Sequence, residues 1–336
     1  MYTMDTVDKQ GRQEVKVETT KQTHNALIAN EAALGIVTAG RDCLDGVLEN
    51  VYQEDGGLFT FASLGGSKDK YDTGSHSTAH IWNGLVGVGN ESKLANGEVS
   101  YGLFYEYGRG NYDVDGGGYH GSGDAHYNGG GLMARYTGRH NQYVEGSLRF
   151  GQVKNSADSV LHSRSGDAYG YETDGSYWSG HIGFGRIFDL RDETASESRG
   201  GIKRASCDLD VYGKYFYTHM DGDSFRAGDV TYALDDLNSS LLRIGARVNN
   251  RIGLNDFYYG LAWDYEFDGE SDGSVSVAGL RAPICQADIG GSSLMAELGW
   301  KREATPDNPW DVNLGLRAYA GQHKRIGGSA FVGYHF

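Results

Sequence analysis

The side chains best suited to covalent chemistry are scattered along this sequence rather than gathered in motifs. It contains 11 histidines, and the candidate general bases are His76, His80, His181 and His219. None of them stands in a recognisable nucleophile motif, in which a nearby base would activate a serine or an acid. A hydrolase is therefore the weaker alternative, and we expect no catalytic residues.

The three cysteines indicate neither a metal centre nor a disulfide framework. Cys43, Cys207 and Cys285 are odd in number and widely spaced, unlike zinc-binding or disulfide-rich patterns. We interpret them as unpaired residues without chemistry, although a bridge such as Cys43–Cys285 is compatible with an oxidising compartment. The sequence predicts no cofactor and no metal ion.

The charged residues do follow a pattern, because many of them alternate with apolar residues along strand-like segments. Side chains of a strand point alternately to two faces, so one face of these segments is apolar and the other carries opposite charges. The basic members of the charged face are Arg135, Arg149, Lys214, Arg243, Arg247 and Arg317. Its acidic members are Glu106, Glu145, Asp208, Asp264, Glu266 and Glu297.

The composition suits a large antiparallel sheet. Glycine occupies 52 of 336 positions and tyrosine 23, while proline occurs 3 times. Proline cannot donate to a strand ladder, and a disordered chain would be poor in aromatic residues. The net charge of -15 argues against nucleic acid as a partner, because phosphate binding requires a basic face.

One segment near the start has helical periodicity. Between residues 25 and 52, leucine and valine recur at spacings of three, four and seven, so they share one face of a helix. About 28 helical residues would span about 42 Å, enough to cross a membrane. The other faces carry polar residues: Asn30, Glu31, Arg41 and Asp42. A helix with these charges belongs in a polar tube, and no run of 18 apolar residues offers a transmembrane helix.

From Gly57 onward the period switches to two, which predicts twelve strands. They lie at about 58–64, 81–88, 99–107, 132–136, 144–150, 177–184, 208–217, 242–248, 257–267, 294–300, 312–318 and 330–336. The connections mostly alternate between short and long, as periplasmic turns and outer loops do in membrane barrels. The expected long loops are 110–122, 154–173, 220–237 and 269–290, and 190–203 is a long turn on the short side.

These strands favour a closed membrane barrel over a soluble sandwich. In hydrocarbon every backbone polar group must be bonded within the protein, so a spanning sheet has to close. An aromatic-rich apolar face toward lipid and a charged lumen fulfil this demand, whereas a sandwich would hide its apolar face between sheets. We predict an all-β fold, a 12-stranded antiparallel transmembrane β-barrel with an N-terminal α-helix inside the pore. Four large apolar residues fall on the charged face and should pack against that helix: Phe104, Phe216, Leu241 and Phe331.

The last predicted strand carries a further signal. Phe336 follows Tyr334 and Val332 on one face, an arrangement that resembles the assembly signal of outer-membrane barrels. A helix, twelve strands and this closing segment together resemble the autotransporter β-domain family of type V secretion translocators. Local similarities are the runs at 269–279, 296–300 and 328–336.

The resemblance covers about residues 24–336 and implies a translocator of the bacterial outer membrane that exports or anchors an N-terminal passenger at the cell surface. It divides the chain into 1–24 as a linker or passenger end, 25–56 as pore helix and turn, and 57–336 as barrel. The implied partners are outer-membrane lipid, the barrel-assembly machinery, periplasmic chaperones and the chain's own passenger, and we expect a monomer. The polar start lacks the apolar core of a signal peptide, so we expect a longer precursor.

Two further expectations concern the helix. Some family members cleave it at an Asn-Asn pair inside the barrel, but Asn25, Asn30 and Asn50 are not adjacent, so we predict no such cleavage. The alternative to a translocator is a general outer-membrane porin or adhesin-like barrel without passenger export. Such a pore needs no helix in its lumen.

Overall fold

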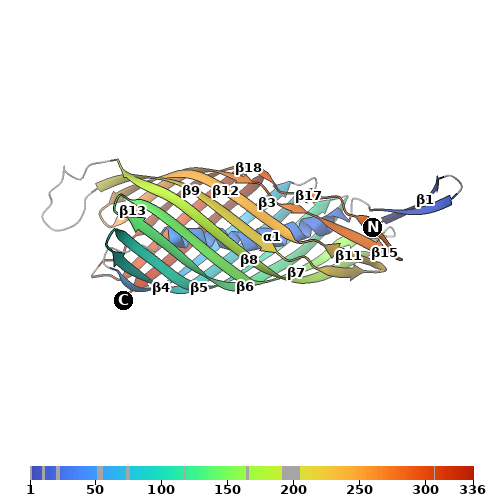
Figure 1. The fold of residues 1–336 in the computed structure, drawn as a ribbon, viewed down its shortest axis with the longest axis horizontal. Helices are drawn as coiled ribbons and strands as arrows, with labels where there is room; N and C mark the ends of the chain where they lie inside the picture. Colours follow the sequence, from blue (N-terminus) through green and yellow to red (C-terminus); the bar gives the residue numbers. More distant parts are fainter. Residues whose placement is uncertain are drawn as a thin grey trace.

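In the computed structural model of the chain, one helix lies inside a closed antiparallel barrel of twelve strands (Figure 1). The structure describes residues 2–9, 12–19, 23–50, 56–72, 76–116, 118–163, 166–190, 205–305 and 307–336. The predicted fold class is confirmed, including the two glycine-rich first strands. No helix within the described residues is long and apolar enough to span a membrane.

The barrel strands follow one another around the wall in chain order, and the last pairs with the first. Their bounds are β3 (Gly57–Asp72), β4 (His76–Leu94), β5 (Gly97–Gly116), β6 (Tyr119–Gly138), β7 (Gln142–His162), β8 (Ala168–Asp189), β9 (Ala205–Met220), β12 (Leu237–Ile252), β13 (Asn255–Glu266), β18 (Gly291–Arg302), β19 (Trp310–Gly321) and β20 (His323–His335). The seam between β20 and β3 places Ala330 opposite Leu64. Closure leaves no barrel edge unpaired.

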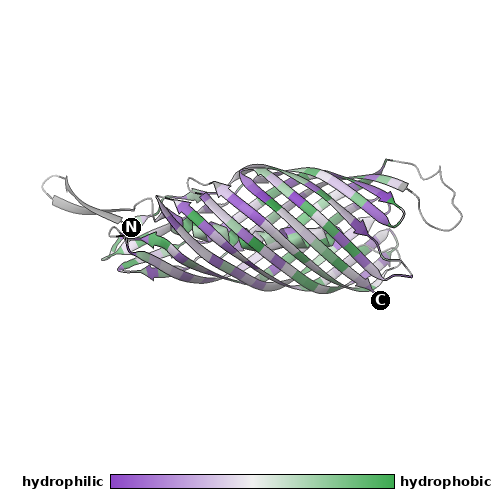
Figure 2. Ribbon diagram, turned by 180° about the vertical axis from the view of Figure 1, so that it is seen from behind, coloured by the Kyte–Doolittle hydropathy of each residue, from purple (hydrophilic) through white to green (hydrophobic). Residues whose placement is uncertain are grey.

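Side chains alternate between the outer surface and the lumen along these strands, as the sequence pattern requires. On β5, the outward Leu103 and Tyr105 are 63% and 55% exposed, whereas the inward Phe104 and Glu106 are buried. Figure 2 shows hydrophobic residues recurring along the wall between hydrophilic ones. The outer surface is therefore apolar over its middle, and the lumen holds the charges.

The expected long loops are largely strand, which corrects the sequence prediction. β5 and β6 remain paired up to Gly116 and Tyr119, and β7 and β8 up to His162 and Ala168. Apolar residues still alternate there, so the ladder continues past the membrane band. The described part of 190–203 is Leu190, because 191–204 lie outside the described residues.

Two of the expected loops, 220–237 and 269–290, form an additional sheet at the end of the barrel to which β5, β6, β7 and β8 extend. Its strands are β10 (Ser224–Ala227), β11 (Val230–Leu234), β15 (Gly273–Val277) and β16 (Leu280–Pro283), paired in that order. The short strands β14 (Glu270–Ser271) and β17 (Ala287–Asp288) pair beside it. We call β10, β11, β15 and β16 the cap sheet.

The two rims of the barrel differ. At one rim the connections are tight, such as the two-residue turn between β12 and β13, where Gly253 has φ +65°. At the other rim lie the extended strands, the cap sheet and the start of the helix. Short turns mark the periplasmic side of an outer-membrane barrel, so the cap sheet faces the cell exterior.

The segment expected to be a linker contains a hairpin. β1 (Tyr2–Lys9) pairs with β2 (Arg12–Thr19) in antiparallel register. Both stretches are rich in threonine and valine, which favour extended backbone. Figure 1 shows β1 beyond the barrel end at which the helix begins.

Candidate functional site

The central feature of the molecule is helix α1 (His24–Leu48), which runs inside the barrel. All of its 25 residues are buried except His24, Asp42 and Gly46. A helix on a protein surface would leave one face in water, so this burial pattern requires contact on every side. The predicted helix, 25–52, extended further; residues 51–55 lie outside the described part of the chain.

A glycine of α1 lies directly against two large side chains of the wall. A Cβ atom on Gly40 would lie 2.0 Å from Tyr127 Oη and 2.6 Å from Arg149 Nη2. Glycine weakens a helix interior by about 1 kcal/mol relative to alanine. We infer that Gly40 is tolerated because only glycine lets the helix backbone lie against these two side chains.

Two carboxylates on the inner half of α1 and one at its C-cap share one face. Asp42, Asp45 and Glu49 follow one another at spacings of three and four, which stack along a helix. They point at the basic residues of the barrel lumen. The helix is therefore held there by charge as well as by packing.

Lys214 on β9 contacts three carboxylates at once. Its Nζ lies 2.5 Å from Asp45 Oδ1, 3.2 Å from Glu49 Oε1 and 2.8 Å from Glu145 Oε1 on β7. The lysine side chain is 1% exposed. A single ammonium group thus joins two carboxylates of the helix to one of the wall.

Arginines complete the contacts of the acidic helix face. Asp42 pairs with Arg243 at 3.4 Å and with Arg325. Glu49 pairs with Arg247 at 2.7 Å and with Arg317 at 3.4 Å. These guanidinium groups come from β12, β19 and β20, so the helix is tied to several strands of the wall.

The same basic residues are paired with carboxylates of the barrel. Arg243 donates to Asp264 through Nε and Nη2, both at 2.9 Å. Arg247 donates to Glu297 at 2.8 and 2.7 Å. Such two-point contacts fix the guanidinium plane, so the wall presents its charges to the helix in a set geometry.

Two further arginines of the wall repeat this arrangement and contact the helix through its backbone. Arg149 pairs with Glu106 at 2.9 Å, and its Nη2 donates to the backbone carbonyl of Val37 at 3.1 Å. Arg135 pairs with Glu145 at 3.1 Å and donates to the carbonyl of Leu48 at 3.3 Å. The barrel therefore also forms hydrogen bonds with the helix backbone.

The outer half of α1 is held by apolar packing instead. The apolar residues between Ala26 and Ala39 belong to one buried cluster with side chains of the extended strands and the cap sheet. Within it, Phe225 of β10 stacks on Tyr171 of β8 at 3.7 Å between ring centroids and on Tyr232 of β11 at 4.9 Å. The cap sheet thus closes over the outer end of the helix.

A comparison with known proteins identifies the family of this chain. Residues 60–324 match the family model described as the autotransporter beta-domain, which is more than half of the chain. The chain belongs to the autotransporter beta-domain family. As predicted from the sequence, it is an outer-membrane translocator domain.

Solved structures of this kind share the fold at low sequence identity. The beta domain of the Bordetella autotransporter BrkA is 17% identical, covering 84% of this chain and all of that one, with a TM-score of 0.62. The transport unit of AIDA-I from Escherichia coli is 13% identical, covering 95% and 100%, with a TM-score of 0.68. The translocator domain of NalP from Neisseria meningitidis is 14% identical, covering 94% and 98%, with a TM-score of 0.60. No curated protein sequence is significantly similar to the chain.

Most of the predicted lumen residues of the translocator lie in the network just described. Glu266 lies apart from it and accepts hydrogen bonds from Ser239 Oγ at 2.8 Å and from the Ser240 amide. Of the predicted helix residues, Asp42 is in the network. Arg41 lies over the Phe216 ring at 5.0 Å and Asn30 Nδ2 has no partner among the described residues. Glu31 is buried.

The inward apolar residues contact the helix as expected. Phe104 and Phe331 belong to a buried cluster with Cys43, Leu44, Val47 and Leu48 of α1. Leu241 lines a small cavity together with Leu34 and Arg41. With Phe216 under Arg41, all four exceptions to the charged face lie beside α1.

Sequence reasoning missed several residues of the network. Asp45 and Glu49 were not singled out, although their spacing from Asp42 already placed the three on one helix face. Asp69 and Arg325, which pair with each other at 2.5 Å across the β20–β3 seam, were also missed. Their strands extend beyond the predicted segments, so the alternation was not followed that far.

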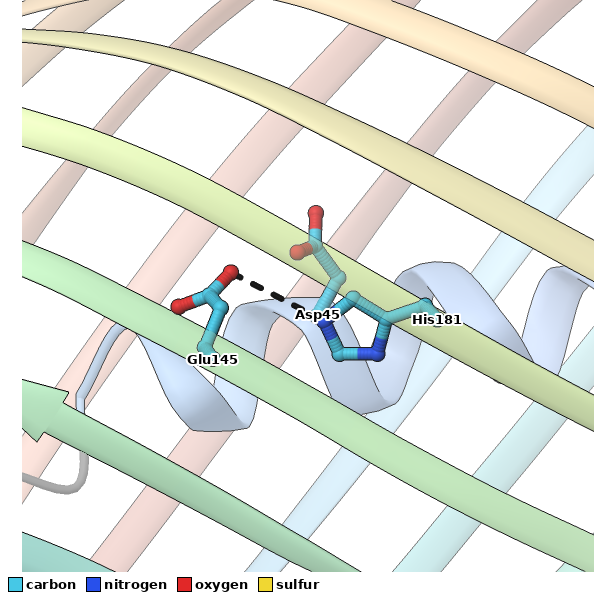
Figure 3. A group of neighbouring side chains, drawn as sticks. All are labelled: Asp45, Glu145 and His181. Atoms are coloured by element: carbon cyan, nitrogen blue, oxygen red, sulfur yellow. Dashed lines mark ion pairs between the residues drawn. The ribbon is translucent and has the colours of Figure 1, made fainter.

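One cluster has the donor types of a metal site. Carboxylate oxygens of Asp45 and Glu145 and a ring nitrogen of His181 lie within 4.8 Å of one another, and Figure 3 shows them converging between α1 and the wall. Lys214 already contacts both carboxylates. Its ammonium group supplies the positive charge that a metal ion would bring, so the cluster is an ion-pair site.

His181 also stands in a triad-like arrangement. Its Nδ1 lies 2.7 Å from Ser147 Oγ, and its Nε2 lies 3.8 Å from Glu145 Oε1. In acyl-transfer enzymes such a serine is open to substrate. Ser147 is 7% exposed, and the His181 ring stacks on Phe216 at 5.2 Å, so this hydroxyl is closed off by packing.

The apolar residues of the predicted assembly signal lie on the outer surface of β20 and at the residue following it. Val332 and Phe336 are 36% and 73% exposed. Tyr334 lies between them, with its ring edge-on to Trp310 and Phe336, both at 4.9 Å. Of the cysteines, Cys43 is buried, Cys207 half-buried and Cys285 exposed, and all three are free thiols.

Proposed function

We propose that this translocator exports a passenger attached on the N-terminal side of α1 and then anchors it at the cell surface. The position of α1 carries the proposal. The helix begins at His24 beside the cap sheet and ends near the periplasmic rim. A chain that precedes His24 would therefore leave the barrel on the outer side.

On this proposal the chain has three functional parts. Residues 1–24 are the end of the passenger or its linker, 25–56 are the pore helix and its turn, and 57–336 are the barrel. The ion pairs of Asp42, Asp45 and Glu49 hold the helix after export, and the plugged lumen limits leakage. Asn25, Asn30 and Asn50 are not neighbours in the chain, so the passenger stays joined unless another protease releases it.

Assembly would depend on partners that bind the outer surface of β20. The outward row of Val332, Tyr334 and Phe336 supports recognition by the barrel-assembly machinery, with periplasmic chaperones protecting the unfolded chain before insertion. The folded translocator would act as a monomer in outer-membrane lipid. We assign it no catalytic step, since the Ser147 hydroxyl is buried.

Conductance in planar bilayers tests the plug. Deleting residues 24–50 should turn a nearly closed barrel into an open channel, because the lumen loses its helix. Deleting residues 2–19 removes the hairpin outside the barrel and is the matched control; it should leave the conductance low. Equal conductance of the helix deletion and the intact chain would favour the porin-like alternative.

Surface display tests export itself. A precursor with a signal peptide and a small epitope ahead of residue 1 should expose the epitope to protease added to intact cells. The same precursor lacking residues 323–336 should leave the epitope protected, because the barrel cannot close without β20. Equal protease sensitivity of both precursors would contradict the proposal.

A further inference from the structure

A group of lysines lies on the outer surface of the barrel at its seam. Lys68 and Lys70 of β3 and Lys324 of β20 are all exposed. The register places Lys70 directly opposite Lys324 and Lys68 opposite Ile326. We call these three residues the seam lysines; they form a basic patch on a chain whose net charge is -15.

The seam lysines lie at the outer border of the apolar band. Toward the periplasm, the neighbouring outward residues are Ile326, Leu64 and Trp82, which are 66%, 63% and 50% exposed. Large apolar side chains this exposed face acyl chains in a membrane barrel. The lysines therefore lie at the depth of the outer-leaflet head groups.

The seam lysines bring like charges together on the barrel surface. Like charges directly opposite each other on neighbouring strands destabilise a sheet. Among the described residues, neither Lys68 nor Lys70 has an ion-pair partner, and the intervening Asp69 points inward to Arg325. Lysines near a membrane surface often extend toward water, so Lys68 and Lys70 can reach an external anion at the depth of the head groups.

An apolar groove begins directly beneath the seam lysines. Gly66 and Gly328 are the next outward positions below Lys68 and Ile326, and they face each other across the seam. The groove has a volume of about 680 Å³, within the usual range of ligand sites. Its larger lining residues are Leu64, Phe257, Leu298, Trp300, Leu314 and Leu316.

The direction of the groove suits an acyl chain. It crosses β3, β20, β19, β18 and β13 in paired rows such as Leu64, Ala330, Leu314, Trp300 and Phe257. Four strand spacings of about 4.8 Å give a length of about 19 Å. Because the strands are tilted, this row descends from the seam lysines toward the membrane centre and the periplasmic side.

We propose that the seam lysines and this groove bind one molecule of the phosphorylated, acylated glycolipid that forms the outer leaflet of bacterial outer membranes. Its phosphates lie among Lys68, Lys70 and Lys324, and one acyl chain lies in the groove over Gly66 and Gly328. Clustered basic residues beside a membrane surface recognise anionic lipid head groups. The charge of the patch and its continuity with the lipid-facing band both fit this occupant.

The head-group half is tested with purified lipid A added to the delipidated barrel, with bound lipid counted by native mass spectrometry. Replacing all three seam lysines by glutamine should weaken binding on the order of a hundredfold, since each lysine near an anionic surface contributes about fivefold. The control is Lys93→Gln, an exposed lysine on the periplasmic half of β4, which should bind as the wild type does. Retained binding by the triple variant would overturn the proposal.

The groove half is tested by filling it. A Cβ on Gly328 would have only the Leu316 Cδ2 atom at 3.2 Å and the Gly315 carbonyl oxygen at 3.5 Å nearby, so Gly328→Leu can fold with its side chain in the groove. The outward Gly180 has the same 3.2 Å spacing to Leu148 Cδ2, which makes Gly180→Leu the matched control. We expect Gly328→Leu to lose lipid A binding at least tenfold and Gly180→Leu to retain it. Equal binding by both variants, or equally tight binding of phosphatidylglycerol by the wild type, would overturn the proposal.

Discussion

Replacing Lys214 by methionine should loosen both the helix and the barrel. Methionine matches the length of the lysine stem but removes the ammonium group that joins Asp45, Glu49 and Glu145 at 2.5, 3.2 and 2.8 Å. The three carboxylates would then lie together without their shared cation. Removing one partner of a buried ion pair typically costs about 3–5 kcal/mol, and the 1% exposure of Lys214 places it in that class.

The effect can be measured by denaturant unfolding in detergent and by conductance in planar bilayers. We expect Lys214→Met to unfold at lower denaturant concentration and to pass more current, because the inner half of α1 loses its central tie. Adding Asp45→Asn to this variant should recover part of the stability, since it reduces the repulsion among the carboxylates that Lys214 joined. Lys154, whose ion pair with Asp174 is solvent-exposed, provides the control Lys154→Met, which should behave like the wild type.

Two results would contradict this role of Lys214. If Lys214→Met unfolded at the wild-type denaturant concentration and remained closed in bilayers, the ion pairs seen at Lys214 would not hold the helix. A uniform loss of stability in both Lys214→Met and Lys154→Met would likewise show that position inside the lumen is irrelevant.

Three further predictions follow from the contacts of the helix and cap. Gly40→Ala should lower the free energy of unfolding by roughly 1–3 kcal/mol through its clash with Tyr127 and Arg149. Gly46→Ala, with nothing within 4 Å of the added methyl, should raise the free energy of unfolding by about 1 kcal/mol. If denaturant titrations showed that both substitutions change this free energy in the same direction, the docking of α1 would be contradicted. Lys214→Ala should create a zinc site at Asp45, Glu145 and His181, so that zinc raises the unfolding midpoint of this variant but not that of Lys214→Ala/His181→Ala or the wild type. Phe225→Ala should speed hydrogen exchange in β10 and β11 without changing exchange in β13, because it removes the stacking on Tyr171 and Tyr232. If the substitution sped exchange equally in all three strands, the cap sheet would not be a separate unit.

The faces of the barrel strands could be predicted from the sequence because a strand has a period of two. Once Leu103 and Tyr105 are assigned to the lipid face, Glu106 must point into the lumen, whatever the rest of the fold. The same reasoning assigned Arg149, Lys214 and Arg243 correctly to the interior. The partners within the lumen depend on which strands meet across it, and a strand pattern does not specify that.

The orientation of the helix and the length of the strands were harder to predict. Helix periodicity predicts the apolar face of the helix. The role of Asp45 and Glu49 can be recognised only when the basic residues of the wall opposite them are known. Polar and glycine-rich stretches such as 110–122 read as loops, yet Tyr112 and Val114 are buried against the outer half of α1. Packing on the helix thus keeps these residues in strands.

The position of α1 inside the membrane-inserted barrel is tested most directly by a disulfide. Cys43 Sγ of the helix donates to Ser63 Oγ of β3 at 3.2 Å, so Ser63→Cys places two thiols side by side across the lumen. With Cys207 and Cys285 replaced by serine, mild oxidation of outer membranes should link positions 43 and 63 in nearly all chains, as read by mass spectrometry of the joined peptides. Failure to form this link, with Cys43 instead reacting freely with a water-soluble maleimide, would contradict a helix threaded through the barrel.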